Sequence, residues 1–282
     1  MRSQLAGILL AVAMVWPGVC AAADIRLVTA DGAITEIVYR LGLESLLVGV
    51  DTTSGFPEAI AALPKVGYLR ALPFEGVLAL QPDMLITSEQ AAPQKNLERL
   101  SKAGVQVEIL PSAWSSEASL HRVQTVGGLL GKEAEARALV ADLQARIDTL
   151  HRSAEARGYR PKVLFVLAAG NHSVMLAGKN TAAEALLDEV NADIAFADLE
   201  GYKPASREAI LASQPDAIVI AESVPGQFNI DNWPELQLLD AWKSGHRLQA
   251  DSMLLLGFGP RLVDAMAAVN EVLPGRQGVA NR

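Results

Sequence analysis

Residues 132–157 read KEAEARALVADLQARIDTLHRSAEAR, a run without glycine or proline. At 3.6 residues per turn, this run makes about seven turns of α-helix. Apolar side chains recur along it at helical spacing and form one stripe: Leu139, Val140, Leu143, Ile147 and Leu150. Gly158 and Pro161 end the run. We predict one long helix that packs across two halves of the chain and joins them. An ordinary surface helix within one domain is the alternative.

Short apolar runs alternate with helical patterns on both sides of this segment. The predicted strands are at 25–29, 46–50, 84–87, 105–110, 162–167 and 217–221. The predicted helices include 33–41, 75–80, 94–103, 116–130, 181–190 and 260–272. Such alternation is typical of α/β domains with parallel sheets. The predicted organisation is a signal peptide, a first α/β lobe, a joining helix and a second α/β lobe, at 1–23, 24–131, 132–158 and 159–282.

The two halves share a sequence pattern. EGVLALQPDMLIT at 75–87 and EAILASQPDAIVI at 208–220 are identical at the Glu, Leu, Ala, Gln, Pro and Asp positions. A helix, a QPD turn and a buried strand would produce this pattern in each half. The matched leading glutamate favours duplication of one lobe over a common α/β idiom.

The N-terminal residues are typical of a secretion signal. Arg2 precedes an apolar stretch that is too short to anchor the chain in a membrane, and small residues at 21–23 provide a cleavage pattern. Cys20, the only cysteine, lies in this segment after Val19, which argues against a lipoprotein signal. The mature chain would therefore lack disulfides, as suits a periplasmic protein. The net charge of −8 argues against nucleic acid as a partner.

The segment KVGYLRALPFE at 65–75 carries the candidate chemistry. It places Tyr68 two positions before Arg70. In an extended segment these side chains would share one face, with the guanidinium close to the phenol oxygen. A nearby cation favours the phenolate, and a tyrosine phenolate is a known ligand of haem iron. The alternative is an amphipathic surface tyrosine, the usual role of this residue in a loop.

The chain resembles the periplasmic binding proteins of the cobalamin, siderophore and haem importers. The signal peptide, the two lobes, the joining helix and the repeated pattern carry this resemblance over the whole mature chain. Four narrower motifs resemble the haem branch, of the Pseudomonas type: VGYLRAL at 66–72, AGKNTAAEAL at 177–186, FADLEGYKPAS at 196–206 and LLGFGPR at 255–261. The resemblance implies two Rossmann-like lobes with parallel sheets, joined by one helix, and a ligand cleft between them.

The resemblance also implies roles for individual residues. Tyr68 matches the axial ligand of the iron in Fe(III) protoporphyrin IX, and Arg70 matches the arginine that hydrogen-bonds the tyrosine oxygen. Glu75 and Glu208 match glutamates that dock on the ABC permease dimer. His172 is a candidate for a further haem ligand. Weaker candidates for the cleft are Phe258, Met253 and Tyr202, with Lys65 and Arg70 as candidate partners for a haem propionate.

The expected function is therefore capture of haem in the periplasm, by a monomer, for an ABC transporter. The same fold with a ferric siderophore or cobalamin as ligand is the alternative. Four histidines without a His-rich loop argue against a zinc or manganese carrier. The sequence has no GxSxG, HExxH or Walker A motif, so we do not expect an enzyme.

Overall fold

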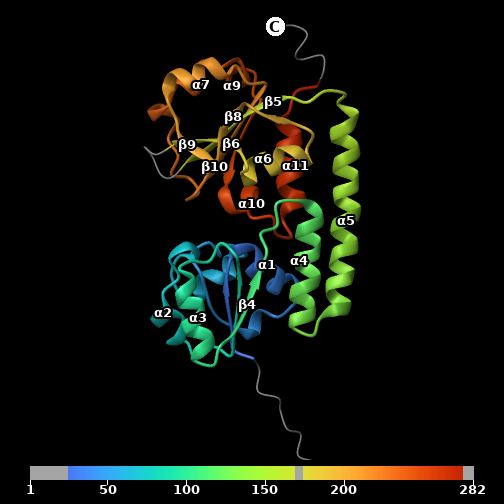
Figure 1. The fold of residues 1–282 in the computed structure, drawn as a ribbon. Coiled ribbons are helices and arrows are strands. Elements are labelled where there is room, and N and C mark those ends of the chain that lie inside the picture. The colour runs from blue at the N-terminus through green and yellow to red at the C-terminus, as the bar shows by residue number, and fades with distance from the viewer. Residues whose placement is uncertain (1–24, 169–173, 276–282) are drawn as a thin grey trace, which may run out of the picture.

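Two α/β lobes are stacked along one long helix in the computed structural model (Figure 1). The structure describes residues 25–168 and 174–275. The predicted signal peptide at 1–23 and the candidate ligand His172 lie outside these ranges. In the residues that are described, no helix combines the length and the apolar character needed to cross a membrane.

The first lobe is built on a sheet of four parallel strands in the order β2-β1-β3-β4. Its strands are β1 (Leu27–Ala30), β2 (Leu47–Val50), β3 (Met84–Ser88) and β4 (Gln106–Leu110). Its helices are α1 (Gly32–Arg40), α2 (Phe74–Leu78), α3 (Gln94–Lys102) and α4 (Ser116–Leu129). Apolar side chains of α1 and α4 pack on one face of the sheet and those of α2 and α3 on the other. The four predicted strands are confirmed here to within two residues at each end.

The second lobe has a mixed sheet with the central order β11-β10-β5-β6-β8. Its strands are β5 (Lys162–Ala168), β6 (Val174–Lys179), β7 (Asp193–Ile194), β8 (Phe196–Glu200), β9 (Tyr202–Pro204), β10 (Ala217–Glu222) and β11 (Arg247–Asp251). Its helices are α6 (Ala182–Glu189), α7 (Arg207–Ser213), α8 (Pro234–Leu238), α9 (Asp240–Lys243), α10 (Ser252–Leu256) and α11 (Leu262–Val272). The parallel prediction holds for β10 against β5 and β11 but not for β6, which is antiparallel to β5 and β9. The reason is the short link between β5 and β6, because a parallel crossover needs about a dozen residues.

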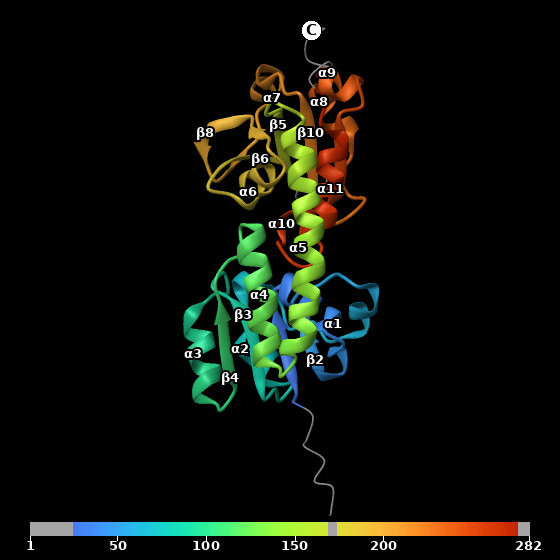
Figure 2. The ribbon, with the colours of Figure 1, turned by 90° about the vertical axis from the view of Figure 1, so that its right-hand side faces the viewer.

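The long helix predicted at 132–157 is α5 (Glu133–Ala156), unbroken along its length. It packs against α4 and α11. Figures 1 and 2 both show it running alongside the two lobes. Its buried side chains, Ala136, Leu143, Ile147 and Ala154, follow helical spacing and include two members of the predicted stripe. The helix therefore contributes apolar contacts over most of its length.

The lobes also meet through a loop of the second lobe at 257–261. The Arg261 guanidinium donates to Glu36 of α1 in two hydrogen bonds, Nε to Oε2 at 3.0 Å and Nη2 to Oε1 at 2.5 Å. Nearby, the Ser119 hydroxyl donates to the Phe258 carbonyl at 2.5 Å. Phe258 itself is 1% exposed, so its predicted position in the cleft is wrong. It belongs instead to one apolar cluster that extends through both lobes.

A second junction joins α6 to the helical pair α4 and α5. The Glu189 carboxylate accepts a hydrogen bond from the Ser116 backbone N–H at 2.7 Å. Its other oxygen lies 2.7 Å from Nε2 of His151 on α5. A carboxylate at a helix N-terminus is stabilised by the unpaired N–H groups and by the helix dipole. Together with the Arg261 contact, this junction restricts how far the lobes can rotate about α5.

Candidate functional site

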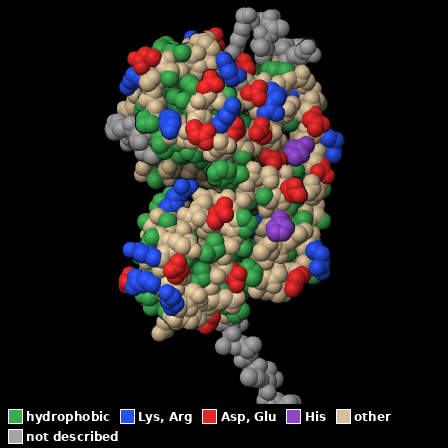
Figure 3. Space-filling model, in the orientation of Figure 1, with side chains coloured by type: hydrophobic (Ala, Val, Ile, Leu, Met, Phe, Trp, Pro, Cys, Tyr) green, Lys and Arg blue, Asp and Glu red, His purple; other side chains and the backbone are tan. Residues whose placement is uncertain are grey.

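The carboxyl ends of the parallel strands of both lobes point toward the gap between the lobes. In Figure 1, β1 rises from the lower end of the molecule, while β5 descends from the upper end of α5. Figure 3 shows a notch between the lobes on the side away from α5, with hydrophobic side chains along its upper rim. Ligands of open α/β sheets bind outside the carboxyl ends of the strands. The notch is therefore the candidate ligand site.

Tyr68 lies just beyond the carboxyl end of β2. The chain before it runs beside β2, with Val66 N–H donating to the Val50 carbonyl and Thr52 N–H to the Gly67 carbonyl, both at 2.9 Å. Gly67 has a φ of +111°. A Cβ there would also lie 2.7 Å from Pro73, so only glycine fits this turn without strain. Tyr68 follows with 47% of its surface exposed. The phenol is thus free to meet a ligand.

Arg70 does not extend the same strand. Residues Leu69–Ala71 form a 3₁₀ turn, so the alternation expected for an extended segment does not apply and that part of the prediction is wrong. Arg70 Nη2 donates to Gln90 Oε1 at 2.5 Å. Gln90 Nε2 lies in turn 3.5 Å from the Ser112 hydroxyl. Arg70 therefore donates to the side-chain amide oxygen of Gln90. Tyr68 and Arg70 nevertheless lie on the same short turn.

Exposed apolar side chains are found on several segments at the carboxyl ends of strands. Among the described residues, several of the large hydrophobic residues that are exposed lie on segments leaving the carboxyl ends of strands: Phe56, Tyr68, Trp114 and Val224. These segments follow β2, β4 and β10, and so come from both lobes. Grouped exposed apolar groups mark binding surfaces more often than scattered ones do. The notch is therefore suited to a ligand with a large apolar surface.

Tyr202 contributes a second phenol, from the other lobe. It begins β9, and its partner across the ladder is Ala177 of β6. Cross-strand partners share one face of a sheet, so the ring lies on the Ala177 face, which α6 also covers. Burial raises the pKa of Tyr202, although the Ala183 N–H, the Thr181 hydroxyl and the Arg70 guanidinium each lower it. Arg70, in the first lobe, thus lies within electrostatic reach of this second-lobe phenol.

The other cleft candidates are placed differently. Met253 packs its methyl group against Gly32 at the lobe junction, where an added Cβ would lie 3.0 Å from it. The Lys65 ammonium donates to the Ser54 carbonyl at 2.7 Å, and burial lowers its pKa. Lys65 is therefore tied to the loop after β2.

Glu75 and Glu208 occupy equivalent places in the two lobes. Each lies in the first turn of a short helix, α2 or α7, that leads through a QPD turn into a central strand. Gln81 and Gln214, which begin these turns, both have left-handed backbones, with φ of 48° and 41°. Glu75 lies 3.3 Å from Arg99, and both side chains are largely exposed. The repeated sequence pattern therefore corresponds to a repeated local structure.

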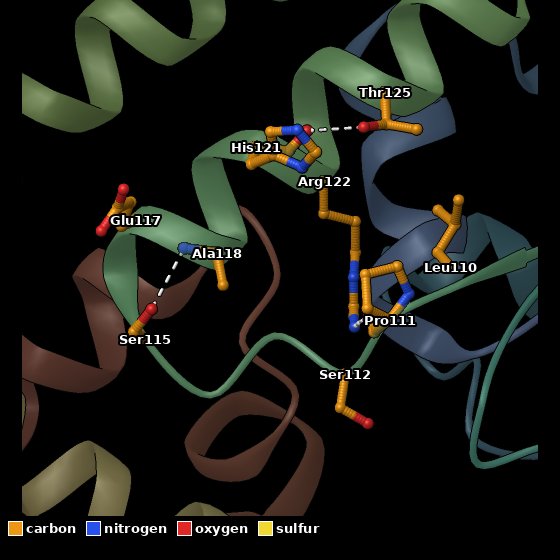
Figure 4. A pocket seen from close by; sticks show the side chains of 9 residues that line it. All are labelled: Leu110, Pro111, Ser112, Ser115, Glu117, Ala118, His121, Arg122 and Thr125. Atoms are coloured by element: carbon orange, nitrogen blue, oxygen red, sulfur yellow. Dashed lines mark hydrogen bonds between the residues drawn. The ribbon is translucent and has the colours of Figure 1, made fainter.

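A separate pocket of about 360 Å³ lies at the β4–α4 connection (Figure 4). Ser112, Ser115, His121 and Arg122 are among its lining residues, and neither Tyr68 nor Tyr202 is. Arg122 is buried and bonds to the Pro111 carbonyl at 2.6 Å and pairs with Asp31 at 3.7 Å. These contacts give it a role in holding the connection. In the described ranges, no three His, Cys, Asp or Glu side chains are grouped as a metal site.

Comparison with known proteins agrees with the two-lobe fold. A family model described as "Periplasmic binding protein" matches residues 27–254. The chain is similar to a solved haem-binding protein of Pseudomonas aeruginosa, with 38% identity, a TM-score of 0.79, and coverage of 88% of this chain and 92% of that one. It is also similar to the apo periplasmic haem-binding protein RhuT of Roseiflexus, with 31% identity, a TM-score of 0.79, and coverage of 89% and 99%.

Curated relatives are more distant in sequence. An uncharacterised ABC transporter substrate-binding lipoprotein of Bacillus subtilis is 28% identical over 84% of this chain and 76% of its own length. A vitamin B12-binding protein of Pectobacterium carotovorum is 25% identical over 70% of this chain and 71% of its own length. The solved structures are named for haem and one of the curated relatives for vitamin B12, so the ligand of this chain follows from its own residues.

Proposed function

This chain belongs to the periplasmic binding protein family, and from that premise we propose that it captures haem in the periplasm and delivers it to an ABC permease. Members of the family bind substrates for transport and are not enzymes. Their place of action is outside the cytoplasm. In this proposal haem is cargo, and a cleavable signal at 1–23 exports the chain.

The observation that carries the proposal is an exposed phenol at the apolar notch. Tyr68 offers the hard oxygen ligand that suits Fe(III), and exposed Phe56, Trp114 and Val224 lie on neighbouring segments. Haem needs both features, because it is a flat apolar disc with a metal at its centre. Arg70 lies two residues from Tyr68 and favours the phenolate when the ligand is bound. Similarity to two solved haem-binding proteins supports the same assignment.

Delivery requires a surface that the permease can recognise in both lobes. Glu75 and Glu208 provide one carboxylate in each lobe, at equivalent positions. A partner with two-fold symmetry would require such a pair. The hydrogen bonds at Arg261 and Glu189 hold the two lobes together and oppose a wide rotation about α5. We therefore infer that release depends on docking and not on a wide opening of the free protein.

The spectrum of the purified protein with added haem tests the ligand. We expect a Soret band together with the charge-transfer band of a haem–phenolate complex, reached at saturation with stoichiometric haem. Cyanocobalamin tests the alternative, because a more distant relative is named for vitamin B12. Addition of the protein should not change the absorption spectrum of cyanocobalamin, and cyanocobalamin should not alter the haem titration. Tight cobalamin binding with no haem spectrum would contradict the haem proposal and support the alternative.

Removal of both docking carboxylates tests delivery. In Glu75→Ala with Glu208→Ala, haem binding should be retained, while the apparent affinity for the permease in proteoliposomes falls by about tenfold or more, because charged interface pairs stabilise docking. ATPase stimulation at fixed protein concentration reports this loss. The matched control is Glu133→Ala with Glu155→Ala, which removes two exposed carboxylates from α5. Unaltered stimulation in the first variant would refute the docking assignment.

A further inference from the structure

The two carboxylates proposed to dock on the permease differ in their surroundings, although their helices are equivalent. Glu75, in the first lobe, lies 3.3 Å from Nη2 of Arg99 on α3. The Arg99 guanidinium also lies over the ring of Phe74, 3.8 Å from its centroid. An ion pair and a contact with an aromatic face therefore hold this cation beside Glu75. Because the pair is exposed, a cation of a partner has to compete with Arg99 for the carboxylate.

Glu208 has no such competitor in the second lobe. Its flanking arginine, Arg207, donates from Nη1 to Oε1 of Glu235 at 2.6 Å. The other end of the same guanidinium, Nη2, donates to the Asn232 carbonyl at 3.2 Å. Adjacent residues of a helix do not face each other, so Arg207 is directed away from Glu208. Within the described ranges, the exposed Glu208 carboxylate forms no ion pair with a side chain. The carboxylate of the second lobe is therefore open to a partner.

The remaining charges of α3 strengthen this contrast. Lys95, Arg99 and Lys102 recur at helical spacing and share one face of α3, and all three are exposed. Glu98 is the one acidic residue of this helix. Figure 3 shows Lys and Arg side chains gathered over the lower left of the molecule, where Figure 1 places α2 and α3. A cation that approaches Glu75 is therefore also repelled by the charges of α3.

We propose that docking on the permease is asymmetric, with Glu208 as the stronger contact and Arg99 as an internal competitor for Glu75. The inference rests on the proposed delivery function and extends it to the share that each lobe contributes. A permease dimer that presents the same cation to each lobe meets a free carboxylate in one lobe and a paired one in the other. Exposed ion pairs change an equilibrium constant by up to about fivefold, so Arg99 weakens docking of the first lobe by up to that factor.

Titration of the permease in proteoliposomes with haem-loaded protein tests the asymmetry, with ATPase stimulation as the signal. We expect Glu208→Ala to raise the concentration needed for half-maximal stimulation by about fivefold or more, and Glu75→Ala by about twofold or less. Arg99→Ala should lower that concentration by about two- to fivefold, because it frees Glu75 for the permease. Combined with Glu75→Ala, the same arginine substitution should have a much smaller effect, since the carboxylate that it frees is absent.

Arg137→Ala is the matched control for the arginine substitution. It removes one exposed cation from α5, so the net charge changes as in Arg99→Ala while Glu75 and α3 stay intact. Half-maximal stimulation should require the same concentration as for the wild type. Haem titration of every variant checks that the fold and the ligand site are unaltered.

The outcomes separate this inference from the proposed function. Equal losses in Glu75→Ala and Glu208→Ala, or an unchanged affinity in Arg99→Ala, would each overturn the asymmetry and leave docking through both carboxylates standing. Weaker docking in Arg99→Ala would overturn it as well, because Arg99 would then contact the permease itself. If neither glutamate variant weakens docking, or if the wild type does not stimulate the permease, the docking assignment is lost together with this inference.

Discussion

Tyr68→Ala is expected to lose most haem affinity, by at least about 100-fold, while the protein stays folded. Changes to groups that merely orient a metal ligand already cost about 10- to 100-fold in affinity, so removal of the ligand itself should cost at least the upper value. The fold should tolerate the change because Tyr68 is 47% exposed and begins a short 3₁₀ turn instead of filling the core. Titration of the apoprotein with haem, followed by absorption, measures the loss.

Tyr68→Phe separates the oxygen from the ring. It keeps the aromatic surface beside the notch and removes only the phenol oxygen, so it should lose the charge-transfer band and most of the affinity. A far-UV circular dichroism spectrum and an unfolding midpoint equal to those of the wild type exclude misfolding as the cause. If haem still binds to Tyr68→Phe with an unchanged spectrum, the iron ligand is another residue, and the assignment made from the VGYLR motif is wrong.

Arg261→Ala is expected to lower the free energy of unfolding by about 3–5 kcal/mol. The Arg261 and Glu36 side chains are only 16% and 6% exposed, and the substitution leaves the Glu36 carboxylate buried without its partner. Contact of the guanidinium with the Phe56 ring, 4.1 Å away, is lost as well. For a chain of this size the loss corresponds to a fall in the unfolding midpoint of about 6–20 °C. Differential scanning calorimetry measures it.

Arg99→Ala is the matched control for this substitution. Arg99 also pairs with a glutamate, Glu75 at 3.3 Å, and also lies over an aromatic ring, Phe74 at 3.8 Å. The pair differs in exposure, with the two side chains 50% and 79% exposed. Exposed ion pairs contribute about 0–1 kcal/mol, so this variant should be nearly as stable as the wild type. Equal losses in the two variants would show that burial of the Arg261 pair is not what stabilises the lobe junction.

The effect of Arg261→Ala should also depend on pH. Burial raises the pKa of Glu36, and Arg261 opposes this shift, so removal of the guanidinium raises the pKa further. A carboxyl whose pKa is higher in the folded than in the unfolded state binds more protons when folded, and stability falls as pH rises through that interval. The difference in unfolding free energy between variant and wild type should therefore be smaller at pH 5 than at pH 7.5.

The sequence determined the parts of this protein that depend on local pattern. Helical spacing and the absence of glycine and proline gave α5, found at Glu133–Ala156 against the predicted 132–157. Apolar runs between turn residues gave the strands of the first lobe and both β5 and β10. The repeated QPD pattern gave two equivalent helix–turn–strand units. In each case the information lies within about a dozen neighbouring residues, where periodicity directly reports which side is buried.

Only the tertiary structure decided which distant residues meet. The sequence shows that Phe258 is apolar but not whether a ligand or the other lobe covers its side chain. The structure places Phe258 in the apolar core that runs through both lobes. Glu36 and Arg261 are paired across 225 positions, and Tyr202 lies opposite Ala177 only because β9 adds to β6. Contacts of this kind depend on strand order and lobe packing, which involve the whole chain. Local spacing therefore predicted the lobes and their link, whereas the surroundings of each site residue followed from how the lobes fold and pack.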